Sequence, residues 1–204
     1  MVNLCLIACY LFVIYNVNPL PALAKLRGKG VAFHLFCGAT LTLILLASLT
    51  GGLSSQLPLH FMGLAAAALV IGYQLTLCAI ALVTLACCLT GNLNLGDIDG
   101  YLFAGYLIPL FVFEKWRQLT YDDNIWRFSF ITAGAGSLIV IIVKTLSMSL
   151  YYIFVSDIAV DKVINQYIIL SPLFWLPELL FNATILITLL QHRPQWVLRY
   201  RPIE

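Results

Sequence analysis

Charge is scarce in this sequence. Only 10% of its 204 residues are charged, whereas a soluble domain of this length carries about 25%. The stretches 31–50 and 61–89 contain no Asp, Glu, Lys or Arg at all. Such runs are typical of membrane-spanning helices, because a backbone in lipid must satisfy its own hydrogen bonds. The chain is therefore predicted to be an all-α, multi-pass protein of the cell (inner) membrane, forming a single integral-membrane domain over 1–204.

Several functional motifs are also missing. No phosphate-binding loop is present, and the GAGS stretch at 134–137 lies inside an apolar run, unlike a nucleophile elbow. None of the 6 cysteines has zinc-knuckle or redox-pair spacing. Residues 1–15 lack the basic start and the cleavage site of a signal peptide, so they are read as part of the first span. We therefore expect no enzymatic activity, no prosthetic group and no nucleic-acid partner.

The apolar runs predict about seven transmembrane helices. The run 59–90 would make one helix of roughly 48 Å, although the hydrocarbon core is only about 30 Å thick. Gly72 lies near its middle, so the run is divided there. The predicted spans are 2–17, 31–50, 59–72, 74–90, 101–114, 127–155 and 167–191.

The distribution of basic residues supports this division. Lys and Arg concentrate in 18–30, in 115–127 and in the tail after 191. Basic connecting segments lie on the cytoplasmic side of membrane proteins. If the run 59–90 is one span, the segment 18–30 lies on the other side of the membrane from the two later basic segments. If the run is two spans, all three segments lie on the same side. The prediction is an amino terminus outside and a carboxyl terminus inside.

Two ionisable residues are predicted to lie deep in the membrane. Lys144 and Glu178 each fall roughly 16 Å from the outer ends of their spans. An isolated charge at this depth costs about 2.5–3.5 kcal/mol. Asn182 follows Glu178 by four positions and shares its helix face. We expect Lys144 and Glu178 to form a buried polar pair with Asn182 nearby, or each to face a polar interior.

A second group of polar residues is predicted at the outer face. It comprises the amine of Met1, His60, Asp97 and Asp99, which are plausible ligands for a divalent transition metal. His34 is predicted near the inner face and His192 in the tail, so a cluster of several histidines is excluded. For His60 alone, an interfacial histidine bonded to backbone or water is the alternative.

Three segments of the sequence resemble a known family. They are "HLFCGATLTLILLASLTGGLSSQLPLHFMGLAAAALVIG" (34–72), "DGYLFAGYLIPLFV" (99–112) and "LPELLFNATILITLLQHRPQW" (176–196). They resemble the energy-coupling-factor (ECF) ABC transporter permeases of the CbiM-like group, which are cobalt/nickel substrate-binding membrane subunits. The resemblance implies about seven helices and a metal site near the outer face. His60 matches one of the family's ligands, and Met1 would supply the amine.

The resemblance also defines the expected function and its alternatives. It implies a substrate-binding permease subunit for Co²⁺ or Ni²⁺, driven by a coupling membrane subunit and cytoplasmic ATPase subunits. The family's histidine at the second residue is Val2 here, so other ligands, another metal or a non-metal cargo are open. The alternatives are a small-molecule transporter, a stand-alone membrane protein of related fold, and an intramembrane enzyme or assembly factor centred on Glu178.

Overall fold

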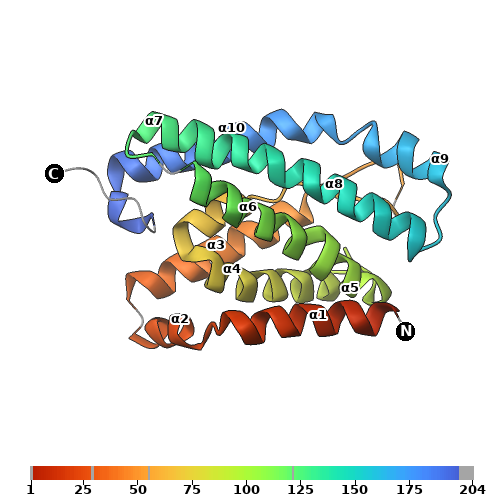
Figure 1. The fold of residues 1–204 in the computed structure, drawn as a ribbon, viewed down its shortest axis with the longest axis horizontal. Coiled ribbons are helices and arrows are strands. Elements are labelled where there is room, and N and C mark those ends of the chain that lie inside the picture. Colours follow the sequence, from red (N-terminus) through yellow and green to blue (C-terminus); the bar gives the residue numbers. More distant parts are fainter. Residues whose placement is uncertain (1, 29, 55, 121, 198–204) are drawn as a thin grey trace.

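The structure is an elongated bundle of helices that run along its long axis (Figure 1). It is a computed structural model that describes residues 2–28, 30–54, 56–120 and 122–197. In chain order the elements are α1 (Val2–Val17), α2 (Leu20–Ala24), η1 (Lys25–Gly28), α3 (Val31–Ser48), β1 (Thr50–Gly51), β2 (Leu59–His60), α4 (Leu64–Leu89), η2 (Leu95–Asp97), α5 (Ile98–Gly100), η3 (Tyr101–Leu107), α6 (Ile108–Leu119), α7 (Ile125–Arg127), η4 (Phe128–Ala135), α8 (Gly136–Phe154), α9 (Val160–Val163), η5 (Ile164–Ile168), α10 (Pro172–His192) and η6 (Pro194–Trp196). The β1–β2 pair is antiparallel.

The helices are those of a membrane protein. Within the described residues, 5 continuous helices are long and apolar enough to cross a membrane: Val31–Ser48, Leu64–Leu89, Leu95–Leu119, Ile125–Phe154 and Pro172–His192. The helices Leu4–Val17 and Leu20–Arg27, bent by 67°, would make a sixth span if counted together. The expected all-α membrane fold is thus confirmed, whereas seven spans remain a prediction.

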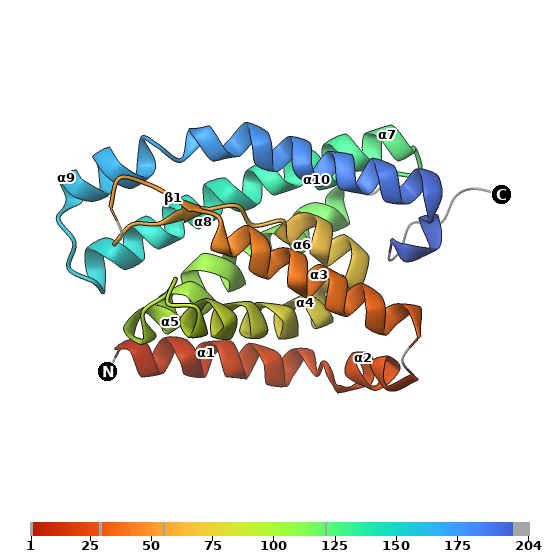
Figure 2. The same cartoon turned by 180° about the vertical axis from the view of Figure 1, so that it is seen from behind.

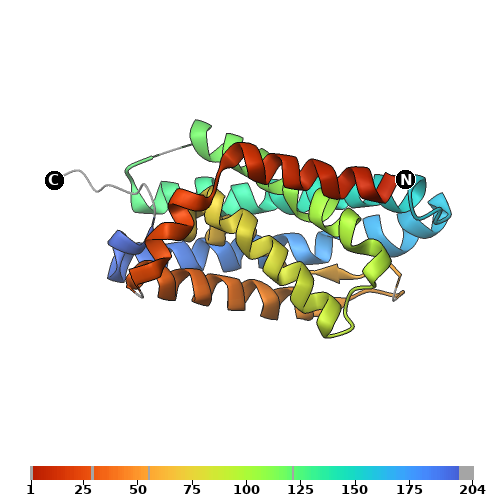
Figure 3. The same ribbon diagram turned by 90° about the horizontal axis from the view of Figure 1, so that it is seen from below.

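The long apolar run is interrupted at Gly72, as expected. Gly72 has φ 82° and ψ 160° inside α4, a combination open essentially only to glycine. The parts before and after it run in different directions (Figures 1 and 3). The helix does not begin at residue 59, where the span was predicted to start, because Leu59–His60 pair with β1 and the helix begins only at Leu64.

Other predicted boundaries also need correction. The span predicted at 101–114 belongs to a helix of 95–119, because polar residues continue the helix past the apolar run. The span predicted from 167 begins at Pro172, since α9 and η5 form a separate short helical segment before it. Polarity alone therefore located these helices but not their ends.

The connecting segments collect at the two ends of the bundle. The start of α1, α5 and α9 lie at one end, called here the α9 end (Figures 1 and 2). Its contacts include a 2.6 Å hydrogen bond from Lys162 Nζ to Gln56 Oε1. The opposite end, called the α7 end, contains α2, α7 and the carboxyl-terminal part of α10. The described parts of the three basic segments, which are 18–28, 115–120 with 122–127, and 192–197, lie at the α7 end.

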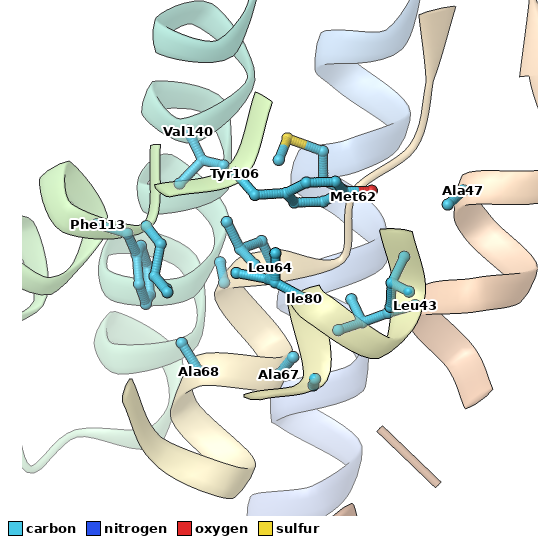
Figure 4. Packing of buried hydrophobic residues seen from close by; sticks show 14 of the residues in the cluster. Leu43, Ala47, Met62, Leu64, Ala67, Ala68, Ile80, Tyr106, Phe113 and Val140 are labelled. Atoms are coloured by element: carbon cyan, nitrogen blue, oxygen red, sulfur yellow. The ribbon is translucent and has the colours of Figure 1, made fainter. Parts of the chain in front are cut away.

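The first half of α4 forms the centre of the core. Every residue from Leu64 to Ile71 is buried, because the alanines Ala65–Ala68 let neighbouring helices approach closely. Figure 4 shows Leu64 and Ile80 of α4 among side chains from four other elements, which are Leu43 of α3, Tyr106 of η3, Phe113 of α6 and Val140 of α8. The side chains of this half-helix are therefore largely enclosed by neighbouring helices.

The break in α4 predicts that replacing Gly72 lowers the stability of the fold. Gly72→Ala is expected to lower the free energy of unfolding by about 1–3 kcal/mol, because the new Cβ is strained at this backbone conformation. Gly38→Ala is the control, since a Cβ at Gly38 meets no atom within 4 Å. It should be neutral or stabilising by up to about 1 kcal/mol. Unfolding of the purified protein in detergent measures both, and equal effects would contradict the prediction.

Candidate functional site

His60 is carried into the bundle by extended chain. The β1–β2 register pairs Thr50 with His60 and Gly51 with Leu59, which turns the chain back after α3. His60 is buried, with 4% of its surface exposed. The chain stays non-helical up to Gly63, which has φ 61°, and α4 begins at the next residue. This part of the chain therefore enters the bundle as extended chain and continues as a half-helix.

The start of the half-helix is capped by a neighbouring helix. Glu178 of α10 accepts hydrogen bonds from the backbone N–H of Met62 at 3.0 Å and of Gly63 at 2.7 Å. Asn182, one turn later, accepts from the backbone N–H of Ala66 at 2.8 Å and donates to Glu178 Oε1 at 2.9 Å. Both side chains are fully buried. A carboxylate at a helix N-terminus satisfies unpaired donors and complements the helix dipole.

Lys144 contacts His60 rather than Glu178. Its Nζ lies 3.0 Å from Nε2 of His60 and 3.4 Å from the backbone oxygen of His60. The other ring nitrogen, Nδ1, lies 3.0 Å from the backbone oxygen of Phe61. Both ring nitrogens of His60 have a hydrogen-bond partner when Nδ1–H donates to the backbone oxygen of Phe61 and Nε2 accepts from Lys144. The imidazole is then neutral, as burial and a nearby cation favour.

The expected direct pair of Lys144 and Glu178 is not formed. Among the residues that the structure describes, the ion pairs are Arg117–Glu114 and Arg127–Asp122. Both oxygens of Glu178 already accept from backbone N–H groups, and Asn182 adds a third donor. Each residue instead faces a polar interior, which was the second expectation.

A small chamber lies beside His60. Its volume is about 10 Å³, close to the space that one water molecule requires. The rings of Tyr101 and Tyr106 lie over His60, with centroids 6.0 and 6.1 Å away. Thr84 and Cys87 of α4 also line the chamber. The chamber thus combines an imidazole, hydroxyl groups and a thiol in a buried space.

A larger polar cavity lies towards the α9 end. It has a volume of about 220 Å³ and is lined by side chains that include Gln56, Asn94, Asp97 and Ser156. Tyr101, Asn92 and Leu93 line both this cavity, called here the vestibule, and the chamber. Tyr101 therefore stands between a polar entrance and His60.

The expected metal ligands are not brought together. Asp97 lines the vestibule, whereas Asp99 is buried and accepts a 3.1 Å hydrogen bond from the hydroxyl of Tyr151. Met1 lies outside the described residues. Within 2–28, 30–54, 56–120 and 122–197, no group of three or more His, Cys, Asp or Glu side chains could hold a metal ion. His60 is thus the one proposed ligand that faces the chamber.

Sequence reasoning missed several parts of this site. Tyr101, Tyr106 and Cys87 were not singled out, because single aromatic residues and cysteines in apolar runs carry no distinguishing signal. The backbone donors of Met62 and Gly63 have no signal in residue type either. These donors could have been expected only if the sequence had shown that the start of a helix inside the bundle faces a buried carboxylate.

Comparisons with known proteins give no match for this chain. No model of a protein family matches the chain. No curated protein and no solved structure gives a significant match either. The resemblance to ECF permeases therefore stays a hypothesis supported by the three sequence segments.

The cap predicts a large effect of removing Glu178. Glu178→Ala leaves the backbone donors of Met62 and Gly63 unpaired in an apolar interior, which costs about 1–3 kcal/mol for each donor. Glu178→Gln keeps one acceptor oxygen and is expected to cost less. Thermal unfolding in detergent measures both changes.

The matched control for this prediction is Asp122→Ala. Asp122 pairs at 3.5 Å with Arg127, whose side chain is 70% exposed, so its removal should cost about 1 kcal/mol or less. If Glu178→Ala is no more harmful than Asp122→Ala, the cap does not stabilise the fold.

Proposed function

We propose that the chain is the substrate-binding permease subunit of an ECF-type ABC importer. The observation that supports this most is the interrupted third crossing, in which extended chain and a half-helix place His60 against Lys144 beneath a polar vestibule. Membrane transporters commonly form substrate sites where a helix is interrupted near the midplane. The proposed role is binding and passage of a substrate, not catalysis.

The proposed topology has seven crossings in the cell (inner) membrane. The β2–Gly63 segment with the first half of α4 is one crossing, and the rest of α4 is the next. The α7 end, with its basic segments, would face the cytoplasm. The vestibule at the α9 end would then open outside, as import requires.

The first candidate substrate is a transition metal ion such as Co²⁺ or Ni²⁺. Neutral imidazole is a common ligand for such ions, and the vestibule adds the carboxylate of Asp97 on the entry path. Binding requires the lone pair of His60 Nε2, which accepts from Lys144 in this structure. Lys144 must therefore withdraw before a metal binds, with Met1, Asp97 or Asp99 supplying further ligands.

A specific observation favours a second candidate, a small polar molecule. Both ring nitrogens of His60 already take part in hydrogen bonds, and the described residues contain no group of three metal-binding side chains. A polar molecule could exchange hydrogen bonds with Lys144, His60 and Tyr101 without displacing a charge. In this alternative, the chain has a fold related to that of the ECF permeases but no longer binds a metal.

Titration of the purified protein with Ni²⁺ and Co²⁺ separates the two candidates. For a metal substrate, His60→Ala should weaken binding by about tenfold or more. Lys144→Met should strengthen it, because the lone pair of Nε2 becomes available. For a small polar substrate, Lys144→Met should abolish uptake of that molecule.

His192→Ala is the control for the titration. His192 is exposed at the α7 end and bonds to the backbone oxygen of Thr188 at 3.0 Å. Its replacement should leave metal affinity unchanged. A metal affinity that is identical in the natural chain and in His60→Ala would exclude a metal site at His60.

The proposed partners are a coupling membrane subunit and cytoplasmic ATPase subunits, which dock on the α7 end. Charged residues at an interface rim mainly steer association, so reversing Lys115 and Arg127 to Glu should reduce recovery of these partners. Affinity purification from native membranes measures this recovery. Lys162→Glu at the α9 end is the control and should leave recovery unchanged. Purification that brings no ATPase with the natural chain would contradict the proposal.

A further inference from the structure

A long apolar groove opens on one side of the bundle. It has a volume of about 500 Å³ and lies between α3, the first half of α4 and α10. Gly38 of α3, Ala66 and Ala67 of α4, and Ile185 of α10 are among the residues that line it. In Figure 2, α3 and α10 lie on the face turned towards the viewer. The groove is therefore on the outside of the bundle, where lipid would surround it.

Small side chains keep the groove open. A Cβ built on Gly38 meets no atom within 4 Å. Only Thr40, Leu43 and Ala47 of α3 are buried, so most of this helix faces outwards. The groove also reaches Gly63 and Ala66, beside the hydrogen bonds that cap the half-helix. Whatever fills the groove thus packs against the interrupted crossing.

A second pocket, lined mainly by apolar residues, continues the groove at the α7 end. It has a volume of about 540 Å³ and shares Val31, Leu35, Val70 and Trp196 with the groove. Its charged and amide lining residues include Lys25, Arg117, Glu114 and Gln195. Arg117 is paired with Glu114, whereas Lys25 has no acidic partner within the described part of the chain. The pocket therefore keeps one uncompensated positive charge.

We propose that the groove and pocket together bind one anionic phospholipid. An acyl chain lies in the groove, and the phosphate lies at Lys25 with the amide of Gln195 as a further donor. Basic pockets between transmembrane helices on the cytoplasmic side suit anionic headgroups. This site does not depend on the identity of the transported substrate.

The charge at one end of the groove favours a phospholipid over a partner helix. The apolar groove continues into a pocket that contains Lys25, which has no acidic partner among the described residues. An apolar channel with a basic end matches the acyl chain and the anionic headgroup of one lipid. A bound acyl chain would cover the apolar face of the half-helix and hold it against Glu178 and Asn182.

Native mass spectrometry of the delipidated chain tests this proposal. The protein is mixed with phosphatidylglycerol or phosphatidylcholine of the same acyl composition, and the retained lipid is counted. The natural chain should retain more phosphatidylglycerol. Lys25→Ala should reduce that preference by about fivefold, the effect of one basic residue near an anionic lipid. Lys115→Ala is the control, because Lys115 lies at the same end over the ring of Phe111 and outside both cavities.

A second variant tests the acyl chain. Gly38→Leu fills the groove and should reduce retention of both lipids, while the open space around Gly38 lets the fold persist. Cys37→Leu is its control, since it changes an exposed residue of α3 outside the groove. Equal retention of the two lipids by the natural chain would overturn the proposal. So would cross-linking from Gly38→Cys to a partner's helix in native membranes, since the groove would then be a protein interface.

Discussion

The arrangement of this protein depends on how it satisfies the start of a helix inside an apolar core. The half-helix that begins at Leu64 would leave backbone N–H groups without acceptors, and in a membrane no water can take their place. Glu178 and Asn182 provide the acceptors from α10. The buried carboxylate in turn is stabilised by these same donors. Each feature would be costly alone, and together they fix α10 against α4.

This cap also determines what surrounds it. Glu178 accepts its hydrogen bonds from Met62, Gly63 and Asn182, and Lys144 has its contact with His60 instead. The extended chain before the half-helix gives His60 its depth and leaves the chamber and vestibule between it and the α9 end. On the other side, the same half-helix forms the floor of the groove proposed to hold a lipid. The polar site and the lipid groove therefore share one structural element.

Several features could be predicted from residue type and spacing. The long uncharged runs indicated a membrane protein, and the length of the run 59–90 indicated an interruption at Gly72, where the structure has one. Lys144, Glu178 and Asn182 were expected to be buried, and they are. The direct pair of Lys144 and Glu178 is not formed, because depth along a helix gives position on one axis only. The direction in which each side chain points depends on how the helices rotate and pack.

The sequence by itself determined that the helices are apolar enough to cross a membrane and that the long run 59–90 is interrupted at Gly72. These depend on polarity and length, which can be read along the chain. The tertiary structure decided that Glu178 caps a helix and that His60 lies in a strand beside Lys144. Those contacts join residues 84 to 116 positions apart, and the donors that Glu178 binds on the half-helix are backbone N–H groups. Such groups are the same in every residue except proline, so only the folded arrangement distinguishes them.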